Sequence, residues 1–326
     1  MNVFSIGIRN MSNKYMSKLS ILKKIIEKTA GRTQLLHKGR EQILEEKRKE
    51  LMAKGLPKRR PIDGVKDIIL VSSGKGGVGK STVSVNLAVS LKEKFTTKEV
   101  GLLDADIFGP CVPLMMNAQE KPFTNTEGKM LPLRNWGIKC ISMGQFVEND
   151  KAVIWRGLMV MQALETLLRK VEWGNLDYLI IDTPPGTGDT HLSLIQNIPI
   201  SAVVMVTTPQ KPSLQVTARS IAMFKKMNVN IAGVVENMSH VVCPHCGHDA
   251  SPYGNGTIEF CKGHGLPILG SIPLESDIAT STDIGKPIVI SKPDSDASHK
   301  FHLIADRVVQ YLKKQTNQAA KTEETT

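Results

Sequence analysis

The chain has 326 residues, of which 41% are hydrophobic and 22% charged, which suits one large globular domain, and no apolar run approaches the ~20 residues that a membrane-spanning helix needs. Its formal net charge of +11 belongs to residues 1–60, which contain 16 Lys and Arg against 5 Asp and Glu. The rest of the chain contains 26 basic and 26 acidic residues, so no nucleic-acid partner is expected for the body of the protein.

The first 40 residues are basic and poor in acids. They contain nine Lys and Arg residues and a single acid, Glu27. Apolar side chains recur there on one helical face, at Tyr15, Leu19, Leu22 and Ile26. A basic amphipathic start is typical of a mitochondrial presequence, which predicts delivery to the mitochondrial matrix. A disordered basic tail is the alternative.

Three further segments follow this start. Residues 41–66 are interpreted as a charged helix and a linker, because Gly55-Leu56-Pro57 ends a charged helical pattern. Residues 67–314 are the predicted folded domain, which includes a C-x-x-C loop at 243–246. Residues 315–326 are predicted to be a disordered tail.

The folded domain alternates predicted strands with predicted helices. The strands are expected at 68–73, 100–104, 138–142, 178–182, 202–207, 231–236 and 268–272. The helices are expected near 80–93, 157–170, 189–196, 213–227, 256–263, 276–284 and 297–314. Several strands are continuous apolar runs, the pattern of a strand that is covered on both faces. This predicts an α/β fold: a doubly wound, mostly parallel sheet with helices on both faces and ligands at the carboxyl ends of the strands.

A glycine-rich loop lies between the first strand and the first helix. It reads Gly74-Lys75-Gly76-Gly77-Val78-Gly79-Lys80-Ser81, the phosphate-loop pattern G-x-x-x-x-G-K-[ST] in its strand–loop–helix context. Its backbone N–H groups are expected to donate hydrogen bonds to phosphate. Lys80 is expected to bind the β- and γ-phosphates, and the Ser81 hydroxyl is expected to coordinate Mg²⁺. The loop therefore predicts a nucleoside triphosphate site. The contacts expected here are Gly74, Lys75, Gly76, Gly77, Val78, Gly79, Lys80, Ser81 and Thr82.

Polar side chains end further strands at the same edge of the sheet. Asp104 and Asp106 lie at the end of the second strand. One of them is expected to support the water shell of the metal, and the other to hold the attacking water. Asp182 ends an apolar strand, the position of a Mg²⁺-linked acid, and Asp189 suits either this site or a helix N-cap. Asn237 ends another strand, and its amide suits a nucleobase edge because it both donates and accepts.

Four segments together resemble the Mrp-type iron–sulfur carrier ATPases, part of the deviant P-loop group that includes the bacterial division-site ATPases. They are KGGVGKS at 75–81, DADIFGP at 104–110, DTPPGTGD at 182–189 and ENMS at 236–239. The resemblance covers residues 55–312, and it makes the folded domain a predicted P-loop ATPase domain. The segments at 55–58, 155–161 and 197–200 are most similar to the mitochondrial branch, whose members help to assemble respiratory complex I.

The resemblance implies roles for individual residues. Lys75 would reach the nucleotide of a second copy, so that ATP is sandwiched in a homodimer. Asp106 would position the attacking water, Asp104 would support the metal shell, and Asn237 would contact adenine. The catalytic residues expected on this basis are Lys75, Lys80, Asp104, Asp106 and Asp182, and the expected Mg²⁺ shell consists of Ser81, Asp104 and Asp182.

Three positions depart from the pattern of the family. Cys111 replaces a usual serine, Lys211 replaces an acid, and Glu275 replaces an aspartate near the base. Glu275 is retained as an expected nucleotide contact. Cys111 and Cys140 are expected to be buried thiols without a role.

Cys243 and Cys246 form the C-x-x-C pair, in a loop after the sixth of the strands expected above. An Fe–S cluster normally takes four thiolates, so a single chain is two short. The resemblance implies that a second copy supplies the other two, in a [4Fe–4S] cluster shared across the homodimer. An intramolecular zinc site with Cys261 and His264 is one alternative, and a pair of unliganded thiols is the other.

The main hypothesis is an ATP-dependent iron–sulfur carrier that turns over slowly and delivers its cluster to apo-proteins such as complex I subunits. The alternatives are a positioning or partition ATPase that binds membrane or DNA, a zinc-stabilised P-loop ATPase, and a metabolic kinase. A membrane-binding member would carry a basic amphipathic C-terminal helix. The helix expected at 299–314 has a core-like apolar stripe and modest basicity, so at most peripheral membrane contact is expected.

Overall fold

The computed structural model describes residues 59–146, 157–243 and 245–323. The expected presequence at 1–40 and the charged helical pattern before residue 55 lie outside the described residues. Within the described ranges, no helix combines the length and the apolar character that crossing a bilayer requires.

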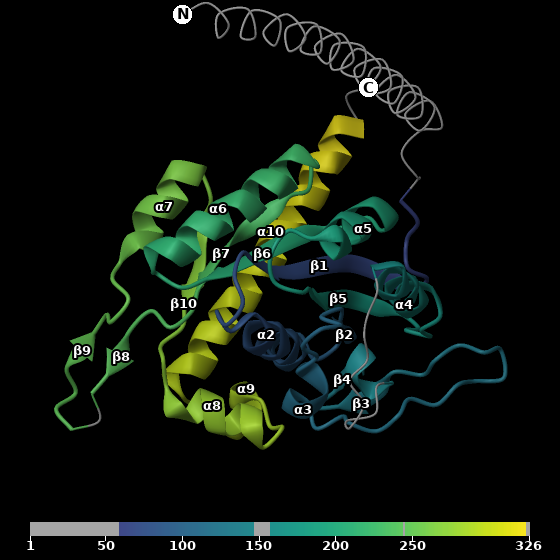
Figure 1. The fold of residues 1–326 in the computed structure, drawn as a ribbon, viewed down its shortest axis with the longest axis horizontal. Helices are drawn as coiled ribbons and strands as arrows, with labels where there is room; N and C mark the ends of the chain where they lie inside the picture. Colours follow the sequence, from purple (N-terminus) through teal and green to yellow (C-terminus); the bar gives the residue numbers. More distant parts are fainter. Residues whose placement is uncertain (1–58, 147–156, 244, 324–326) are drawn as a thin grey trace, which may run out of the picture. The chain divides into compact units, whose positions relative to one another are not determined.

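The centre of the structure is an eight-stranded sheet in the order β10-β7-β6-β1-β5-β2-β4-β3 (Figure 1). Its strands are β1 (Val65–Ser73), β2 (Val100–Asp104), β3 (Leu133–Asn135), β4 (Ile138–Ser142), β5 (Leu176–Asp182), β6 (Ala202–Thr207), β7 (Ile231–Glu236) and β10 (Ile268–Ser271). All neighbouring strands run parallel except β3, which pairs with β4 in the antiparallel sense. The doubly wound, mostly parallel sheet expected from the sequence is confirmed.

Helices cover both faces of the sheet (Figure 1). One face packs against α2 (Lys80–Lys94), α3 (Val112–Met115), α9 (Ile288–Ser291) and α10 (Asp296–Glu323). The other face packs against α4 (Gly157–Arg169), α5 (Asp189–Asn197), α6 (Lys211–Lys226) and α7 (Gly256–His264). Along β1, Ile69 and Val71 belong to the first core and Ile68 and Leu70 to the second. Both sides of the strand are therefore buried, which explains its unbroken apolar run.

Each of the strands expected from the sequence is present, and so is each of the expected helices. Several short elements were not expected: α3, α9, β3, the 3₁₀ helix η1 (Met143–Gln145), and a hairpin of β8 (Val241–Val242) and β9 (Asp249–Ala250). The helix expected near 276–284 is α8 (Ser276–Asp283), and the one expected near 297–314 is part of α10. These short elements have too few residues to show a hydrophobic period.

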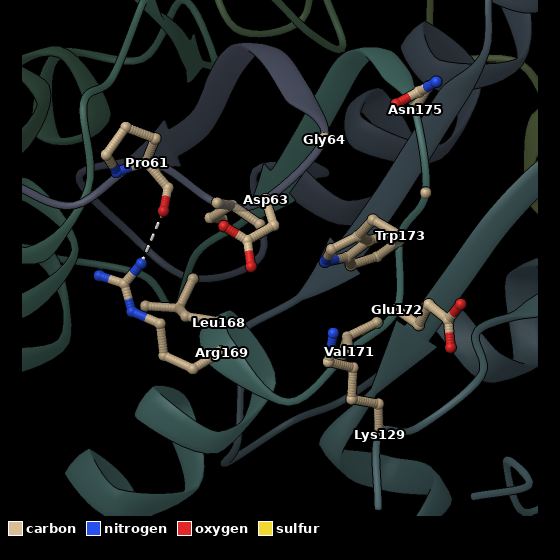
Figure 2. Close-up of a pocket in the computed structure, with 12 residues that line it drawn as sticks. Pro61, Asp63, Gly64, Lys129, Leu168, Arg169, Val171, Glu172, Trp173 and Asn175 are labelled. Carbon is tan, nitrogen blue, oxygen red and sulfur yellow. Dashed lines mark hydrogen bonds between the residues drawn. The ribbon is translucent and has the colours of Figure 1, made fainter. Parts of the chain in front are cut away.

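Two expected boundaries are wrong. Residues 315–323 are helical, where a disordered tail was expected, because α10 continues to Glu323 through a stretch that has neither Gly nor Pro. Residues 59–64 are packed on the body, where a linker was expected. Ile62 is 4% exposed, and Arg169 Nη1 donates a hydrogen bond to the Pro61 carbonyl oxygen at 2.9 Å (Figure 2).

Candidate functional site

The glycine-rich loop runs from the end of β1 to the start of α2. Gly79 precedes the helix with φ of 82°, a left-handed conformation that favours glycine. Gly74 is required for a different reason: a Cβ atom there would lie 2.5 Å from the backbone nitrogen of Thr217 on α6. The loop borders a cavity of about 260 Å³, which Lys75, Lys80 and Ser81 also line. Seven of the nine expected contacts of the loop, all except Gly74 and Val78, therefore line one cavity.

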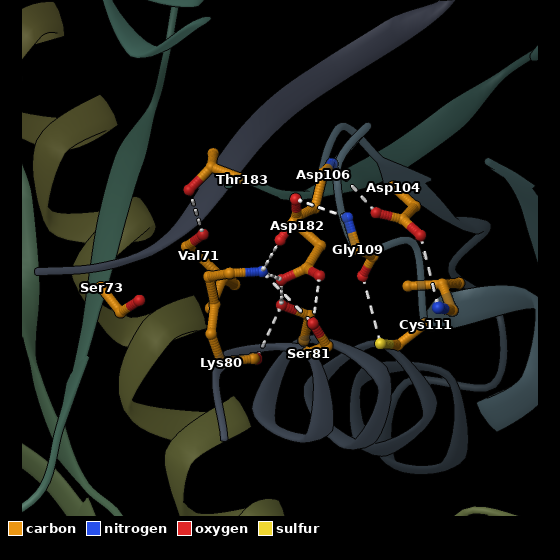
Figure 3. A network of polar contacts seen from close by, with 12 residues as sticks. Val71, Ser73, Lys80, Ser81, Asp104, Asp106, Gly109, Cys111, Asp182 and Thr183 are labelled. Carbon is orange, nitrogen blue, oxygen red and sulfur yellow. Dashed lines mark hydrogen bonds and ion pairs between the residues drawn. The ribbon is translucent and has the colours of Figure 1, made fainter. Parts of the chain in front are cut away.

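Asp182 lies at the centre of a polar network beside this cavity (Figure 3). Its carboxylate is fully buried at the end of β5. Oδ1 accepts a hydrogen bond from Lys80 Nζ at 2.7 Å and from Ser84 Oγ at 2.6 Å, and Oδ2 accepts one from Ser81 Oγ at 2.6 Å. The lysine, hydroxyl and carboxylate expected to bind phosphate and Mg²⁺ are thus brought together.

Ser84 was not expected to belong to this network. It lies one helical turn after Lys80, and its hydroxyl also lies 3.0 Å from the Lys80 carbonyl oxygen. The spacing along the helix was the available signal, because a residue four positions after the loop lysine faces the same side of α2.

Asp104 and Asp106 occupy different places. Asp106 lines the cavity, with Oδ2 at 3.8 Å from Lys80 Nζ, and burial raises the pKa of its carboxyl while Lys80 opposes the rise. Asp104 is fully buried: Oδ1 accepts from the Asp106 backbone N–H at 3.0 Å, and Oδ2 accepts from Ser142 Oγ at 2.9 Å. Burial, with repulsion from Asp182, raises the pKa of Asp104 to about 8. The carboxyl of Asp104 is thus engaged in holding the loop that carries Asp106.

Cys111 was expected to be buried and is instead exposed. It borders the phosphate cavity, and its Sγ lies 3.1 Å from the carbonyl oxygen of Gly109. It immediately precedes the short helix α3, an element that the sequence did not reveal. Cys140, on β4, is buried as expected, and burial raises the pKa of its thiol to about 12.

A second cavity of about 270 Å³ shares Gly79 and Thr82 with the phosphate cavity. It is lined by Asn237 and Glu275, so the two residues expected near the base are brought together. Asn237 Nδ2 donates a hydrogen bond to the carbonyl oxygen of Val78 at 2.8 Å. One amide N–H is therefore used to hold the glycine-rich loop, and Oδ1 is the acceptor that remains for a base.

His191 is a further residue that the sequence did not single out. It lies fully buried on α5, with Nε2 at 3.0 Å from Thr183 Oγ1 and 3.1 Å from Ser72 Oγ. The Thr183 hydroxyl gives its one proton to the carbonyl oxygen of Val71 at 2.9 Å, so it accepts from the imidazole, and Nε2 carries the proton. His191 thereby ties the segment after Asp182 to the strand that leads into the glycine-rich loop.

Cys243 and Cys246 lie at the tip of the β8–β9 hairpin. The hairpin is closed by the Cys243 N–H, which donates to the His248 carbonyl oxygen at 2.9 Å. Cys246 is exposed and Cys243 is half-buried. Hydrogen bonds from the backbone of Cys246 and His245 lower the pKa of the Cys243 thiol. The pair is therefore accessible, and Cys243 is shifted toward the thiolate, the form that binds metal.

The structure does not form the alternative zinc site. Cys261 lies on α7 with its side chain in the core, and burial raises the pKa of its thiol to about 11. His264 Nδ1 lies 2.9 Å from the carbonyl oxygen of Phe260, within its own helix. Among the residues that the structure describes, no three His, Cys, Asp or Glu side chains are grouped closely enough to hold a metal ion.

Comparisons with known proteins indicate the family of this chain. A family model described as "ParA: NUBPL iron-transfer P-loop NTPase" matches residues 64–309. The "Iron-sulfur cluster transfer protein NUBPL" of Mus musculus is 48% identical over 273 residues, which cover 83% of this chain and 86% of the mouse protein. The "Iron-sulfur protein required for NADH dehydrogenase, mitochondrial" of Arabidopsis thaliana is 49% identical over 253 residues, covering 77% of this chain and 80% of that protein.

A solved structure is also similar. It is the nucleotide-binding protein of Archaeoglobus fulgidus in complex with ADP, which matches with a TM-score of 0.63 at 33% identity. The match covers 74% of this chain and 93% of that chain. The extent of the family match and the identity to the mouse protein together show that this chain belongs to the NUBPL iron-transfer P-loop NTPase family.

Proposed function

We propose that this protein is an ATP-dependent iron–sulfur cluster carrier. It would hold a [4Fe–4S] cluster as cargo on Cys243 and Cys246 and deliver it to apo-proteins in the mitochondrial matrix, complex I subunits among them. Family membership supports the chemistry, and the names of the mouse and Arabidopsis relatives support the cargo and the compartment. The basic start of the chain is consistent with import.

The observation that carries the proposal is the pair of thiols on the β8–β9 hairpin, where Cys246 is exposed and Cys243 is half-buried. One chain brings two thiols to this tip, and a [4Fe–4S] cluster takes four. A homodimer with the two hairpins facing each other across its two-fold axis would supply the full set. When the ligands belong to two chains, separation of the chains removes half of them from the cluster. Such a cluster is easily released to an acceptor protein.

ATP and Mg²⁺ fit the residues of the glycine-rich loop. Lys80 would bind the β- and γ-phosphates, and Ser81 and Asp182 would hold the metal, with Asp104 fixing the loop behind them. Bound Mg²⁺ would neutralise phosphate charge. Asp106 would position the attacking water. Lys75 is exposed at the mouth of the cavity, where it could reach the nucleotide of a second copy.

The test is anaerobic reconstitution of the purified chain with ferrous iron, sulfide and Mg²⁺–ATP. The expected product is a brown dimer with about four iron and four sulfide per pair of chains and broad visible absorbance. Cys243→Ser should lose both the colour and the cluster. Cys261→Ser is the matched control, and it should keep them because Cys261 is a core residue.

Two results would overturn the proposal. A chain that stays monomeric and colourless after reconstitution would exclude the shared cluster. Stoichiometric zinc that is lost in Cys261→Ser would return the site to the zinc alternative. Transfer itself is tested by mixing the loaded dimer with an apo-ferredoxin and following the recovery of the acceptor's spectrum.

A further inference from the structure

The hydroxyl of Ser84 lies against one oxygen of the buried Asp182 carboxylate. Ser84 Oγ is 2.6 Å from Asp182 Oδ1, and both side chains are fully buried. The same oxygen accepts a hydrogen bond from Lys80 Nζ at 2.7 Å, while Oδ2 accepts one from Ser81 Oγ at 2.6 Å. Figure 3 shows Lys80 and Ser81 converging on the carboxylate. Among the described residues, Oδ1 therefore has two side-chain donors and Oδ2 has one.

The single proton of the Ser84 hydroxyl is directed to Asp182. Two acceptors lie within reach, Asp182 Oδ1 at 2.6 Å and the Lys80 carbonyl oxygen at 3.0 Å. The carbonyl oxygen belongs to the residue four positions earlier in α2, so it also accepts the usual hydrogen bond of the helix. A hydrogen bond to a charged acceptor is shorter and about twice as strong as one to a neutral acceptor, so the carboxylate takes the proton.

The two donors of Oδ1 differ in their other tasks. Lys80 lines the phosphate cavity and is the loop lysine that would bind the β- and γ-phosphates. Its ammonium group also lies 3.2 Å from Ser81 Oγ and 3.8 Å from Asp106 Oδ2. Two bound phosphate groups would take N–H donors and most of the compensating charge of Lys80 away from Asp182. Ser84 is not among the residues that line this cavity, so its hydroxyl stays with Asp182.

The cost of drawing the lysine charge away from Asp182 depends on which donors remain. A buried carboxylate without a hydrogen-bond donor is strongly destabilised, because neither water nor a cation offsets its charge. With Ser84 in place, Oδ1 keeps one donor, and Oδ2 keeps the Ser81 hydroxyl, whose oxygen can still coordinate Mg²⁺. The Ser84 hydroxyl therefore lowers the cost of moving the ammonium group to a phosphate.

We infer that Ser84 is a positioning residue for nucleotide binding, which keeps Asp182 Oδ1 hydrogen-bonded when Lys80 turns to the phosphates. The inference rests on the proposed function, because it requires that the glycine-rich loop binds a triphosphate. Ser84 would contact neither the phosphates nor Mg²⁺, and its effect passes through Asp182 and Lys80. Its hydroxyl favours nucleotide binding more than it favours the fold without nucleotide, where Lys80 donates to the same oxygen.

The experiment compares Ser84→Ala with a matched control on the same helix. Alanine is the best helix former, so the substitution preserves α2. The control is Ser90→Ala, because Ser90 is equally buried on α2 but its hydroxyl has no hydrogen-bond partner among the described residues. Isothermal titration of the full chain with Mg²⁺–ATP, and with ATP in EDTA, measures the affinity. Thermal unfolding without nucleotide measures the stability of the fold.

Ser84→Ala should bind ATP about tenfold more weakly than the wild type, with and without Mg²⁺. Its thermal midpoint should stay within about 3 °C of that of Ser90→Ala, because Lys80 and Ser81 still donate to Asp182. Ser90→Ala should bind ATP as tightly as the wild type. A loss of affinity without a matching loss of stability distinguishes this role from the packing of a buried serine.

A double variant tests whether the effect passes through the charge of Asp182. Asp182→Asn replaces the carboxylate by a neutral amide of similar shape, which needs less compensation when the lysine is drawn away. In that background, adding Ser84→Ala should change the affinity for ATP in EDTA by less than about twofold. EDTA removes the metal, so the loss of a Mg²⁺ ligand in Asp182→Asn does not affect the comparison.

The inference is wrong if Ser84→Ala binds ATP within about twofold of the wild type, since the hydroxyl would then serve only the Lys80 carbonyl oxygen. It is also wrong if Ser90→Ala loses as much affinity, or if Ser84→Ala has its full effect in the Asp182→Asn background. A wild-type chain that binds no ATP would overturn the nucleotide part of the proposed function as well, and that result differs from equal binding by wild type and Ser84→Ala.

Discussion

Lys80 and Asp182 are 102 residues apart in the chain, yet Lys80 Nζ lies 2.7 Å from Asp182 Oδ1. Both side chains are buried, so the pair is held away from water between α2 and the end of β5. A triphosphate in the neighbouring cavity would compete with Asp182 for the lysine. The ion pair therefore ties the end of the glycine-rich loop to the end of β5.

Replacing Lys80 should destabilise the protein without nucleotide. Lys80→Ala leaves the buried Asp182 carboxylate without its cation, which costs about 3 kcal/mol of unfolding free energy. Lys75→Ala is the matched control, because Lys75 is exposed and should change the free energy by less than about 0.5 kcal/mol. Urea denaturation measures both. Equal effects of the two substitutions would mean that the buried ion pair does not contribute to stability.

His191 should make stability depend on pH between its unfolded and folded pKa values. Burial, assisted by Lys80, lowers the pKa of His191 from 6.5 to about 4. In the unfolded chain the imidazole of His191 is protonated below about pH 6.5, whereas in the folded chain it stays neutral until about pH 4. Stability is therefore retained above the unfolded pKa and lost as the pH falls through this window, by at most about 3 kcal/mol.

The measurement is the unfolding free energy of wild type and His191→Gln at several pH values between 7 and about 4. The glutamine keeps an N–H donor but does not titrate, so its stability should fall less steeply with acid. His299→Gln, which replaces an exposed histidine, should follow the wild type. If His191→Gln has the same slope as the wild type, the imidazole is not the group responsible.

Gly74→Ala should destabilise the fold through a steric clash. The new Cβ would lie 2.5 Å from the Thr217 backbone nitrogen, so β1 and α6 must separate, at a cost of about 2–3 kcal/mol. Gly76→Ala, in the same loop, is the control, because its nearest neighbour would be Pro185 Cγ at 3.9 Å. Thermal unfolding of the two variants compares them. If Gly74→Ala unfolds at the same temperature as Gly76→Ala, α6 can move away from the new methyl group at little cost.

Asn237→Ala should weaken nucleotide binding at both of its contacts. It removes the 2.8 Å hydrogen bond to Val78 and the amide of a residue that lines the second cavity, so ATP affinity should fall about tenfold. Isothermal titration with Mg²⁺–ATP measures the change. The control is Asn230→Ala, which replaces an exposed asparagine at the other end of β7. This variant should bind Mg²⁺–ATP as tightly as the wild type. Unchanged affinity in Asn237→Ala would remove this residue from the base site.

The local patterns of the sequence predicted the elements well where they were long. The apolar run before Gly74 and the helix after Ser81 lie where expected, and β2 has the expected bounds at 100–104. Hydrophobic period and glycine placement depend on near neighbours in the chain, so they can be read without the fold. The hairpin that carries Cys243 and the helix that follows Cys111 were missed because they are too short to show a period.

Contacts between distant segments needed the tertiary structure. The sequence indicated that Asp104 and Asp106 share a strand end, but only packing showed that Asp104 faces Ser142 while Asp106 faces Lys80. In the same way, the exposure of Cys111 depends on the packing around it. Neighbouring residues of one loop differ in burial and in hydrogen-bond partners, because the surrounding helices and strands determine which side chain is buried.

The phosphate loop, the alternation of strands and helices, and the cysteine pair could all be predicted without the structure, because each is encoded in consecutive residues. The order of the strands, and with it the contacts between distant residues, depends on the tertiary structure: Asn237 meets Val78, 159 positions away, and His191 meets Ser72, 119 positions away. The physical reason is that burial and hydrogen bonding between distant segments depend on the packing of the whole sheet and its helices, which no local pattern contains.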